Sequence, residues 1–226
     1  IPVNENLYII TMLFDESGSM GSIKDGARAS IQEFIQDRVS KDEANDTRSL
    51  MAIYTFSSSD EDENETVSVR CPLTDVKEIT DFKYDPNGLT ALLDAQMVSI
   101  KRLEEQINTM NPRPGKVIFV TLTDGEENNS IHYTRDNVRD KIQLKKDNDN
   151  WKFVYLGANQ DSFKVGENMA YNNMSTQNYQ ASDEGICSVM RNVSMAVDNY
   201  CREENQEVVL TQNDVSLTDA SLECSQ

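Results

Sequence analysis

Apolar residues follow two alternating patterns along this chain, one typical of strands and one typical of helices. Short apolar runs predict strands, and apolar residues spaced three or four apart predict helices between them. The expected strands are 7–14, 50–56, 66–71, 117–122 and 151–156. The expected helices are 23–39, 76–82, 90–110, 135–146, 165–174 and 184–203, of which 76–82 is short and 165–174 is weak. This alternation predicts an α/β fold, a doubly wound and mostly parallel sheet with helices on both faces.

Two polar stretches indicate how the chain is organised. The stretch 57–65, "SSSDEDENE", is too charged to be buried, so we expect it to connect the second and third strands as a hairpin loop. Beyond Asn205 the chain is polar, and Val208–Leu210 is its only apolar cluster. We therefore expect one domain over 1–204, followed by a polar tail over 205–226 that is ordered only by docking.

The composition narrows the classes of partner. The chain has 39 acidic against 21 basic residues and a formal net charge of −18. This argues against nucleic acid, because neutralising phosphates needs clustered Lys and Arg. No apolar run approaches the ~18 residues of a membrane span, so no membrane insertion is expected. A soluble location, cytoplasmic or in a virion, is favoured.

The four cysteines argue against a structural zinc site. Cys71, Cys187, Cys201 and Cys224 lie far apart and form no C-x-x-C pair. Sparse cysteines in a chain of this length are typical of reduced, buried thiols rather than a disulfide framework. Cys224, in the polar tail, is the one thiol expected to be exposed.

Polar residues with oxygen side chains follow the predicted strands. Asp15, Ser17 and Ser19 come directly after the first strand, Thr90 opens a predicted helix, and Asp124 follows the buried strand 117–122. In doubly wound sheets, ligands bind at the carboxyl ends of the strands, where the strand order reverses. Hard divalent cations such as Mg²⁺ prefer oxygen ligands. These five residues therefore predict a cation site with a position left open for a further anionic ligand.

Each part of this pattern also has an ordinary structural explanation. Ser17 or Ser19 could cap a helix, and so could Thr90. Asp124 followed by Gly125 is, taken alone, most often a turn. The joint occurrence of the three parts at one edge of the predicted sheet favours the cation site.

The three parts, "DESGSM", "GLTALLDA" and "TDGEEN", resemble the metal-ion-dependent adhesion site of von Willebrand factor type A domains. The resemblance covers about 7–203, and the motifs follow the family's order and separations. "TDGEEN" and "VYLGANQDSF" are most similar to stand-alone domains of bacteria, phages and large DNA viruses. The resemblance implies a six-stranded sheet in the order 3-2-1-4-5-6, with one antiparallel edge strand.

The resemblance also implies a role for each site residue. Ser17 and Ser19 would bind the ion through their hydroxyls, and Thr90 directly in the ligand-bound state and through water otherwise. Asp15 and Asp124 would act mainly through water or as anchors behind the direct ligands. The ion would be Mg²⁺, or else Mn²⁺ or Ca²⁺, and a Glu or Asp of a protein partner would complete its octahedron.

We also expect specific roles for the glutamates and glycines that neighbour the site residues. Glu16 should point away from the metal. Gly18 and Gly21 should let the backbone pass close to the ion. Glu126 and Glu127 either add negative potential at the rim of the site or simply form a solvated loop.

These observations favour a divalent-cation-dependent protein–protein binding module over an enzyme. The alternative is a structural or assembly component, for example of a virion. A metal-dependent hydrolase has less support: a haloacid dehalogenase phosphatase needs an Asp where Ser17 stands, and "ESGSMG" does not match the G-x-S-x-G elbow of serine hydrolases. The single histidine, His132, lies in a polar stretch typical of an exposed loop.

Overall fold

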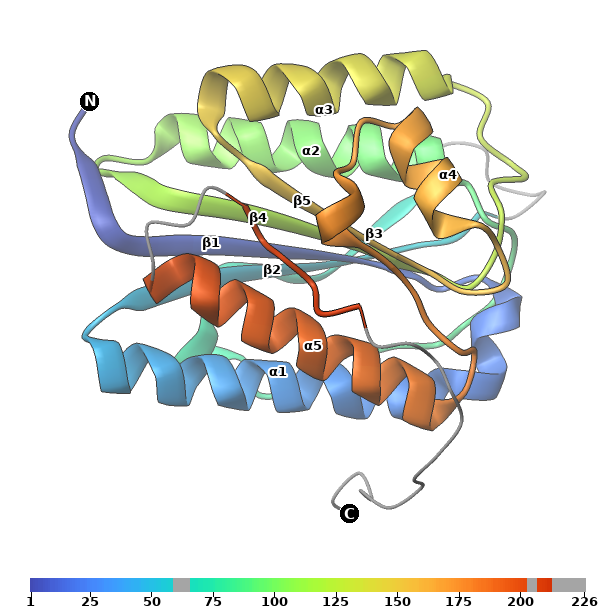
Figure 1. Ribbon diagram of the computed structural model, residues 1–226, viewed down its shortest axis with the longest axis horizontal. Helices are drawn as coiled ribbons and strands as arrows, with labels where there is room; N and C mark the ends of the chain where they lie inside the picture. The colour runs from blue at the N-terminus through green and yellow to red at the C-terminus, as the bar shows by residue number, and fades with distance from the viewer. Residues whose placement is uncertain (59–65, 203–206, 213–226) are drawn as a thin grey trace.

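The computed structural model describes residues 1–58, 66–202 and 207–212, which form a six-stranded sheet between two layers of helices (Figure 1). The strands are β1 (Val3–Asp15), β2 (Arg48–Phe56), β3 (Val67–Asp75), β4 (Arg113–Thr123), β5 (Lys152–Gly157) and β6 (Thr176–Asn178). Their order is β3-β2-β1-β4-β5-β6. The pair of β2 with β3 is antiparallel and the other four pairs are parallel. The expected fold class, strand order and antiparallel edge are therefore confirmed.

The helices divide between the two faces of the sheet. They are α1 (Lys24–Asn45), α2 (Leu92–Thr109), α3 (Arg135–Asp149), α4 (Ser162–Asn168) and α5 (Asp183–Arg202), with 3₁₀ turns η1 (Gly18–Ile23), η2 (Val76–Glu78) and η3 (Asn173–Ser175). Helices α1 and α5 cover one face, and α2, α3 and α4 cover the other (Figure 1). None of the helices in the described residues is long and apolar enough to cross a membrane.

Strand β1 lies at the centre of the sheet and packs on both helical layers. Ile10 and Met12 belong to the core beneath α1 and α5, whereas Ile9 and Leu13 belong to the core beneath α2 and α3. All four side chains are fully buried. A strand covered on both faces needs apolar residues at consecutive positions, which explains the run 7–14, apolar except for the buried Thr11.

Two elements differ from the sequence expectations. The helix predicted for 76–82 is wrong: only the 3₁₀ turn η2 forms there, and Val76 and Phe82 are buried one by one rather than along a helical face. The sixth strand that the resemblance implies was not located in the sequence; it is β6, just beyond the predicted helix 165–174, of which only the first part is helical because α4 ends at Asn168. The three residues of β6, Thr-Gln-Asn, carry no apolar pattern that could signal a strand.

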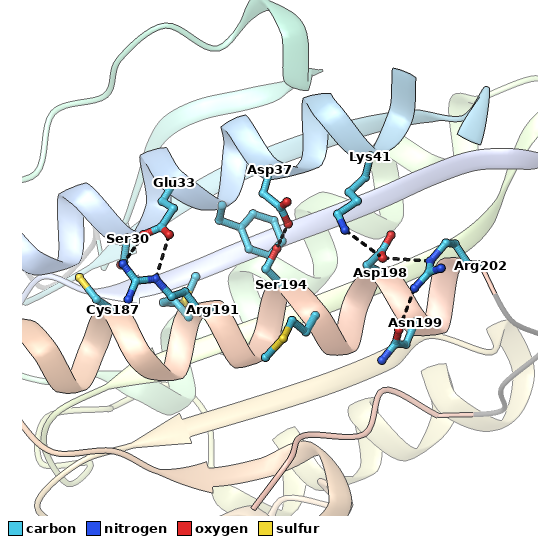
Figure 2. Close-up of a pocket in the computed structure, with 13 residues that line it drawn as sticks. Ser30, Glu33, Asp37, Lys41, Cys187, Arg191, Ser194, Asp198, Asn199 and Arg202 are labelled. Carbon is cyan, nitrogen blue, oxygen red and sulfur yellow. Dashed lines mark hydrogen bonds and ion pairs between the residues drawn. The ribbon is translucent and has the colours of Figure 1, made fainter. Parts of the chain in front are cut away.

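A groove of about 510 Å³ lies between α1 and α5, away from the carboxyl ends of the strands (Figure 2). Its polar side chains bond to each other across the two helices. Arg191 pairs with Glu33 at 2.8 Å, and the Ser194 hydroxyl donates to Asp37 at 2.5 Å. The side chains that line the groove therefore join α1 and α5 to each other; we call this contact region the seam between the two helices.

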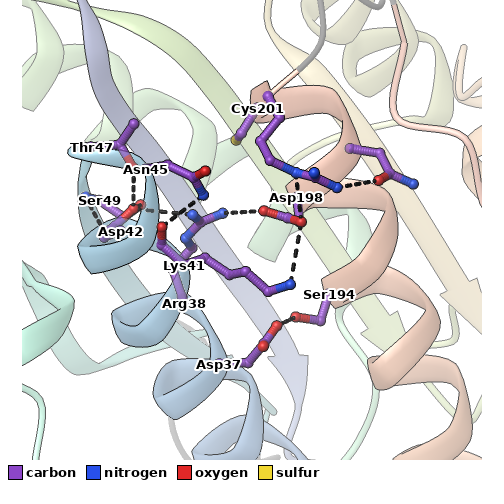
Figure 3. Close-up of polar contacts among 12 residues, drawn as sticks. Asp37, Arg38, Lys41, Asp42, Asn45, Thr47, Ser49, Ser194, Asp198 and Cys201 are labelled. Atoms are coloured by element: carbon purple, nitrogen blue, oxygen red, sulfur yellow. Dashed lines mark hydrogen bonds and ion pairs between the residues drawn. The ribbon is translucent and has the colours of Figure 1, made fainter.

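A buried ionic cluster closes the same seam near the carboxyl end of α5 (Figure 3). Arg38 is buried, with one nitrogen 3.1 Å from Asp42 and another 3.9 Å from Asp198. Lys41 and Arg202 add further contacts to Asp198, at 3.4 and 2.9 Å. Breaking such a cluster leaves a buried charge without a partner, which is costly, so the cluster fixes α5 against α1.

Part of the polar tail, residues 207–212, docks on the domain. The side chains of Val208 and Leu210 are buried in the core beneath α5. The Leu210 amide donates to the Met174 carbonyl at 2.8 Å, and the Asn192 side chain both donates to the Thr211 carbonyl at 2.7 Å and accepts from its amide at 3.1 Å. The domain boundary after residue 204 stays a prediction.

The expectations for the cysteines and for the hairpin loop 57–65 can be compared with the structure only in part. Cys71, Cys187 and Cys201 are buried free thiols. Cys224 and most of the predicted hairpin loop 57–65 lie outside the described residues. The strands on either side of that loop do pair as a hairpin, with Phe56 opposite Val67.

Candidate metal site

The sheet topology places the predicted site residues at one edge. Asp15 is the last residue of β1, Ser17 and Ser19 follow it directly, and Asp124 follows β4. Strands β1 and β4 are neighbours, and the strand order reverses between them. The Ser19 hydroxyl donates to Asp124 Oδ1 at 2.6 Å and lies 3.1 Å from the Ser17 hydroxyl. The loops after β1 and β4 thus meet through the residues expected to meet there.

Thr90 comes from the third loop and borders the same space. A Cβ atom built on Gly125 would lie 3.7 Å from Thr90 Oγ1 and 4.0 Å from Ser19 Oγ. The Thr90 backbone is held in place, because its amide donates to Asn128 Oδ1 at 3.1 Å and its carbonyl accepts from the amides of Asn128 and Asn129. The hydroxyls of Thr90 and Ser19 therefore both border the space beside Gly125.

The three hydroxyls do not serve as helix caps. Ser17 stands at the N-cap position of η1, yet its side chain makes no capping hydrogen bond. Helix α2 begins at Leu92, with Ala91 at its N-cap, so the expectation that Thr90 opens the helix is off by two residues. The capping explanation of these hydroxyls finds no support in the structure.

Asp15 is completely buried among hydrogen-bond donors. Its Oδ1 accepts from the Ser17 amide at 2.8 Å and its Oδ2 from the Thr123 hydroxyl at 2.6 Å. Burial raises the pKa of the Asp15 carboxyl to about 6; the hydrogen bonds from Thr123 and Ser17 oppose this rise, and the charge of Asp124 adds to it. Burying a carboxylate is unfavourable unless a cation or enough donors compensate for the lost water.

Asp124 shares this environment. Burial raises the pKa of its carboxyl, and the hydrogen bond from Ser19 works in the opposite direction. Within the described residues, neither Asp15 nor Asp124 forms an ion pair with a Lys or Arg side chain. Two buried carboxylates close together without a cationic partner make a site where a bound cation would be stabilising.

The spacing of the oxygen atoms fits a small hard cation. Around an octahedral Mg²⁺ with ligands at ~2.1 Å, neighbouring oxygens are roughly 3 Å apart. The Ser17 and Ser19 hydroxyls are 3.1 Å apart, and Ser19 lies 2.6 Å from Asp124. No group of three or more His, Cys, Asp or Glu side chains within the described ranges is arranged to hold a metal ion, so a cation here would depend on hydroxyl oxygens as well as carboxylates.

Glu16 points away from this cluster, as expected, and ties the first loop to its surroundings. Its carboxylate pairs with Arg70 on β3 at 2.5 Å and accepts from the Asp85 amide at 2.5 Å. Its backbone carbonyl accepts from the Asn87 amide at 2.7 Å. Tyr84 adds a hydrogen bond of 2.6 Å to the Asp15 carbonyl. The first loop is thus fastened to the segment that leads to Thr90.

Glu127 has a structural role that the sequence did not reveal. One carboxylate oxygen accepts from the amides of Asn129 and Ser130, and the other accepts from the Leu93 amide and the Ser130 hydroxyl. The expectation that Glu127 is a solvated loop residue is therefore wrong, and its contribution to the negative potential at the rim stays a prediction. Glu127 satisfies a free amide at the start of α2 and joins this helix to the loop after β4. Glu126 is exposed.

Asp94 supports the same loop from the other side. This buried residue of α2 accepts hydrogen bonds from three successive amides, those of Ile131, His132 and Tyr133. Asn159 and Gln160, in the loop after β5, donate to the carbonyls of Asp124 and Gly125, both at 3.0 Å. The loop that carries Asp124 is therefore held by side chains from two other elements.

The glycine that the site requires is Gly88. It has φ +85°, and a Cβ atom there would lie 2.4 Å from the Ser58 carbonyl oxygen. A Cβ on Gly21 would meet nothing within 4 Å, and one on Gly18 would lie 3.6 Å from the nearest atom, which is ordinary contact. Gly18 and Gly21 are thus not required by contacts with other protein atoms, and the expectation that they let the backbone pass close to the ion stays a prediction.

Several solved structures share this fold. Proximal thread matrix protein 1 from the mussel byssus is 16% identical, with a TM-score of 0.57, over 86% of this chain and 46% of that chain. A further structure of it, with a zinc-occupied metal-ion-dependent adhesion site motif, gives 16% identity and a TM-score of 0.52 over the same shares. The pilus adhesin SpaC from Lactobacillus rhamnosus GG is 14% identical, with a TM-score of 0.61, over 88% of this chain and 30% of that chain. The PilB minor pilin from Streptococcus sanguinis is 13% identical, with a TM-score of 0.57, over 85% and 62%.

At these identities the similarity establishes the fold alone, and this chain spans less than two thirds of each of those proteins. A comparison with curated protein sequences gives no significant match. The family model of the von Willebrand factor type A domain matches residues 10–192, from within β1 to within α5. That match covers most of the chain and agrees with the observed strand order. The chain therefore belongs to the von Willebrand factor type A domain family.

Proposed function

We propose that this domain binds a protein partner through one divalent cation. Ser17 and Ser19 hold the ion through their hydroxyls, and Thr90 holds it directly when a ligand is bound and through water otherwise. Asp15 and Asp124 act mainly through water or as anchors behind the direct ligands, and a Glu or Asp of the partner completes the coordination. Domains of this family are generally non-catalytic binding modules, which supports a binding role. The ion is Mg²⁺ in this proposal, with Mn²⁺ and Ca²⁺ as the alternatives.

The observation that carries the proposal is the buried Asp15 beside a cluster of hydroxyls, with no ion pair to any described Lys or Arg. When bound, the cation supplies the positive charge that these carboxylates lack and a coordination position for a carboxylate of the partner. Asp15 orients the Ser17 amide, and Asp124 orients the Ser19 hydroxyl. Neutral hydroxyls in direct contact would leave the ion electrophilic enough to attract a further anion.

The likeness to a pilus adhesin and a minor pilin extends to the fold and is consistent with a role in adhesion. A stand-alone domain of bacterial, phage or large-DNA-virus type remains a proposal that rests on "TDGEEN" and "VYLGANQDSF". The likeness to a matrix protein keeps a second candidate open, a structural component of an assembly such as a virion. A hydrolase finds no support around His132, whose ring is exposed and whose backbone amide is the group that bonds to Asp94.

Direct metal binding tests the first half of the proposal. Purified protein is titrated with Mn²⁺ and the free ion is followed by electron paramagnetic resonance, with Mg²⁺ as competitor. We expect one site per chain in the wild type and loss of that site in the double variant Ser17→Ala/Ser19→Ala. Ser40→Ala, which changes an exposed serine on α1, is the matched control and should bind as the wild type does. Equal binding by the double variant would overturn the assignment.

Partner binding tests the second half. The immobilised wild type, the double variant and the Ser40→Ala control are incubated with extract of the native source, in Mg²⁺ or in EDTA. The proposal expects a protein retained by the wild type and the control only in Mg²⁺. A partner retained equally in EDTA and by the double variant would favour the assembly candidate.

A further inference from the structure

We propose that Asn87 is a site of spontaneous deamidation and isoaspartate formation, in the segment between η2 and α2 that leads to Thr90 of the candidate metal site. Asn87 and Gly88 form the one Asn-Gly pair in the sequence. Glycine has no side chain to shield its amide nitrogen, so an Asn-Gly pair gives that nitrogen the freest approach to the asparagine side chain. Whether the reaction occurs in a folded protein depends on the local geometry.

The geometry at Asn87 favours the reaction. Its side chain is exposed, and the Gly88 amide nitrogen lies 2.9 Å from Asn87 Oδ1. This is the one hydrogen bond of the Gly88 amide within the described residues, so the amide is not held in a strand or a helix. The Asn87 side-chain NH₂ group donates to no other group in the described part of the chain, and it faces water. The nucleophile is therefore beside its carbonyl group, and the leaving group is free to depart.

The reaction needs water as its only co-reactant. The Gly88 nitrogen loses its proton to solvent and forms a bond with Asn87 Cγ, while the bond from Cγ to Nδ2 breaks and ammonia leaves. Water then opens the resulting five-membered succinimide ring. Opening at one carbonyl gives aspartate, and opening at the other gives isoaspartate, in which the main chain runs through Cβ and Cγ. The net change is one water molecule taken up and one ammonia molecule released.

Nearby asparagines lack this geometry, although they lie in the same region. Asn129 is followed by a serine, whose small side chain also leaves the next amide accessible. The Ser130 amide, however, donates to Glu127 at 2.6 Å, and the Asn129 amide donates to the same oxygen at 2.9 Å. These two amides are held by a third residue, Glu127, whereas the Gly88 amide donates to the side chain of Asn87, the group that its nitrogen would attack. The structure thus distinguishes Asn87 from Asn128 and Asn129.

The position of Asn87 gives the modification a structural consequence. The Asn87 amide donates to the Glu16 carbonyl at 2.7 Å, and the Gly88 carbonyl accepts from the Gly18 amide at 3.0 Å. Isoaspartate inserts one methylene group into the main chain between these two contacts. Both contacts belong to the loop that carries Ser17 and Ser19, so the added length must be absorbed where that loop meets the segment before Thr90.

The test follows the folded protein during storage at neutral and mildly alkaline pH. Trypsin releases the peptide 84–101, in which Asn87 is the sole asparagine, and the peptide 117–135, which contains Asn128 and Asn129. Mass spectrometry should show conversion of an amide to an acid in the first peptide, at a rate of the same order as in a free synthetic peptide 84–101. Labelling by an isoaspartate methyltransferase should identify isoaspartate there, and Asn87→Ser should abolish both signals.

Conversion of the free peptide without conversion of the folded protein would overturn the proposal, and so would equal conversion of the peptide 117–135. The structural consequence has its own measurement, made in EDTA so that it is independent of cation binding. The isoaspartate form, separated by ion exchange, should melt below both the wild type and Asn87→Asp, which adds the charge without lengthening the chain. Equal melting temperatures would show that the two contacts do not transmit the change.

Discussion

The hydroxyl of Ser19 donates a 2.6 Å hydrogen bond to Asp124, a residue 105 positions farther along the chain. This contact joins the loops after β1 and β4 directly, side chain to side chain. The oxygen atoms of the candidate site are thus already close to the spacing that a small cation requires. Cation binding should therefore need little rearrangement of these two loops, which lowers its entropic cost.

Replacing Asp15 by Asn separates the role of its charge from that of its shape. We expect Asp15→Asn to lose Mn²⁺ and Mg²⁺ binding, because the site loses one of its two carboxylates. In EDTA the variant should be more stable than the wild type, because it no longer buries a charge without a cation. Thermal melting in EDTA and metal titration measure the two effects. Lower stability in EDTA together with retained metal binding would contradict both.

The pH dependence of stability tests the same environment. The pKa of Asp15 is raised from 3.8 to about 6 in the folded protein, so the folded state holds this proton more tightly than the unfolded chain does. Ionised Asp15 therefore destabilises the metal-free fold above pH ~6, and this penalty is relieved as the pH falls from about 6 toward 4. At 1.36 kcal/mol per pKa unit the full effect is about 3 kcal/mol.

Chemical unfolding in EDTA across this pH range gives the measurement, with Asp15→Asn as the reference. The stability advantage of the variant should be largest above pH ~6 and should shrink as the pH falls. An advantage that stays constant over the range would show that Asp15 does not titrate there.

Gly88 should be far less tolerant of substitution than Gly21. Gly88→Ala places a Cβ atom 2.4 Å from the Ser58 carbonyl oxygen, at a residue with φ +85°. We expect a loss of stability above ~1 kcal/mol, because a side chain in the left-handed region is itself strained and the contact adds to the strain. Gly21→Ala, with nothing within 4 Å of its Cβ, is the matched control and should be close to neutral. Thermal melting of Gly88→Ala and Gly21→Ala measures the loss of stability in each variant. Equal losses of stability would argue against the described backbone at Gly88.

The docked tail offers a test of packing with a neighbouring control. Leu210 is 2% exposed and Val209 is 50% exposed. Leu210→Ala should destabilise the domain by roughly 2–5 kcal/mol, as expected when a buried leucine leaves a cavity. Val209→Ala should change the stability by less than ~0.5 kcal/mol. Denaturant unfolding measures both values, and similar values for the two would show that the segment is not part of the core in solution.

Truncation tests the predicted domain boundary directly. A chain ending at residue 212 retains Val208 and Leu210, whereas one ending at 204 leaves their sites in the core open to water. We expect the longer chain to melt like the full chain and the shorter one to melt lower. Equal melting of the two would support the boundary at 204. A lower melting temperature for the shorter chain would move the boundary beyond Leu210.

The sequence was most informative where periodicity and burial agree. The sequence predicts β1 and β4 because strands covered on both faces must be largely apolar, and it predicts α5 because the apolar face of this helix repeats over five turns. The same reliance on apolar spacing gives a wrong prediction, a helix, for the segment 76–82. Val76, Ile79 and Phe82 have helical spacing and pack against the same core, but only the short 3₁₀ turn η2 forms among them.

The candidate site shows a similar division. Its oxygen side chains could be anticipated because they follow strands that end at one edge of the sheet. The supporting roles of Asp94 and Glu127 could not, because the sequence does not reveal which backbone amides the fold leaves without a carbonyl partner. Those amides belong to the loop between β4 and α3, whose path is set by the packing of several elements. Acidic residues in such a loop look the same in the sequence whether they are solvated or structural.

The two hydrogen bonds between the Asn192 side chain and the Thr211 backbone also affect the choice of an expression host. Asn192, Val193 and Ser194 form an acceptor sequence for N-linked glycans. In the folded domain the Asn192 amide is buried and donates to both Gln177 and the Thr211 carbonyl, at 2.6 and 2.7 Å. A glycan attached before folding would remove one of these hydrogen atoms and place a bulky sugar where the tail docks. Secretory expression would therefore give a glycosylated fraction without the docked tail, and a host that lacks this modification avoids the problem.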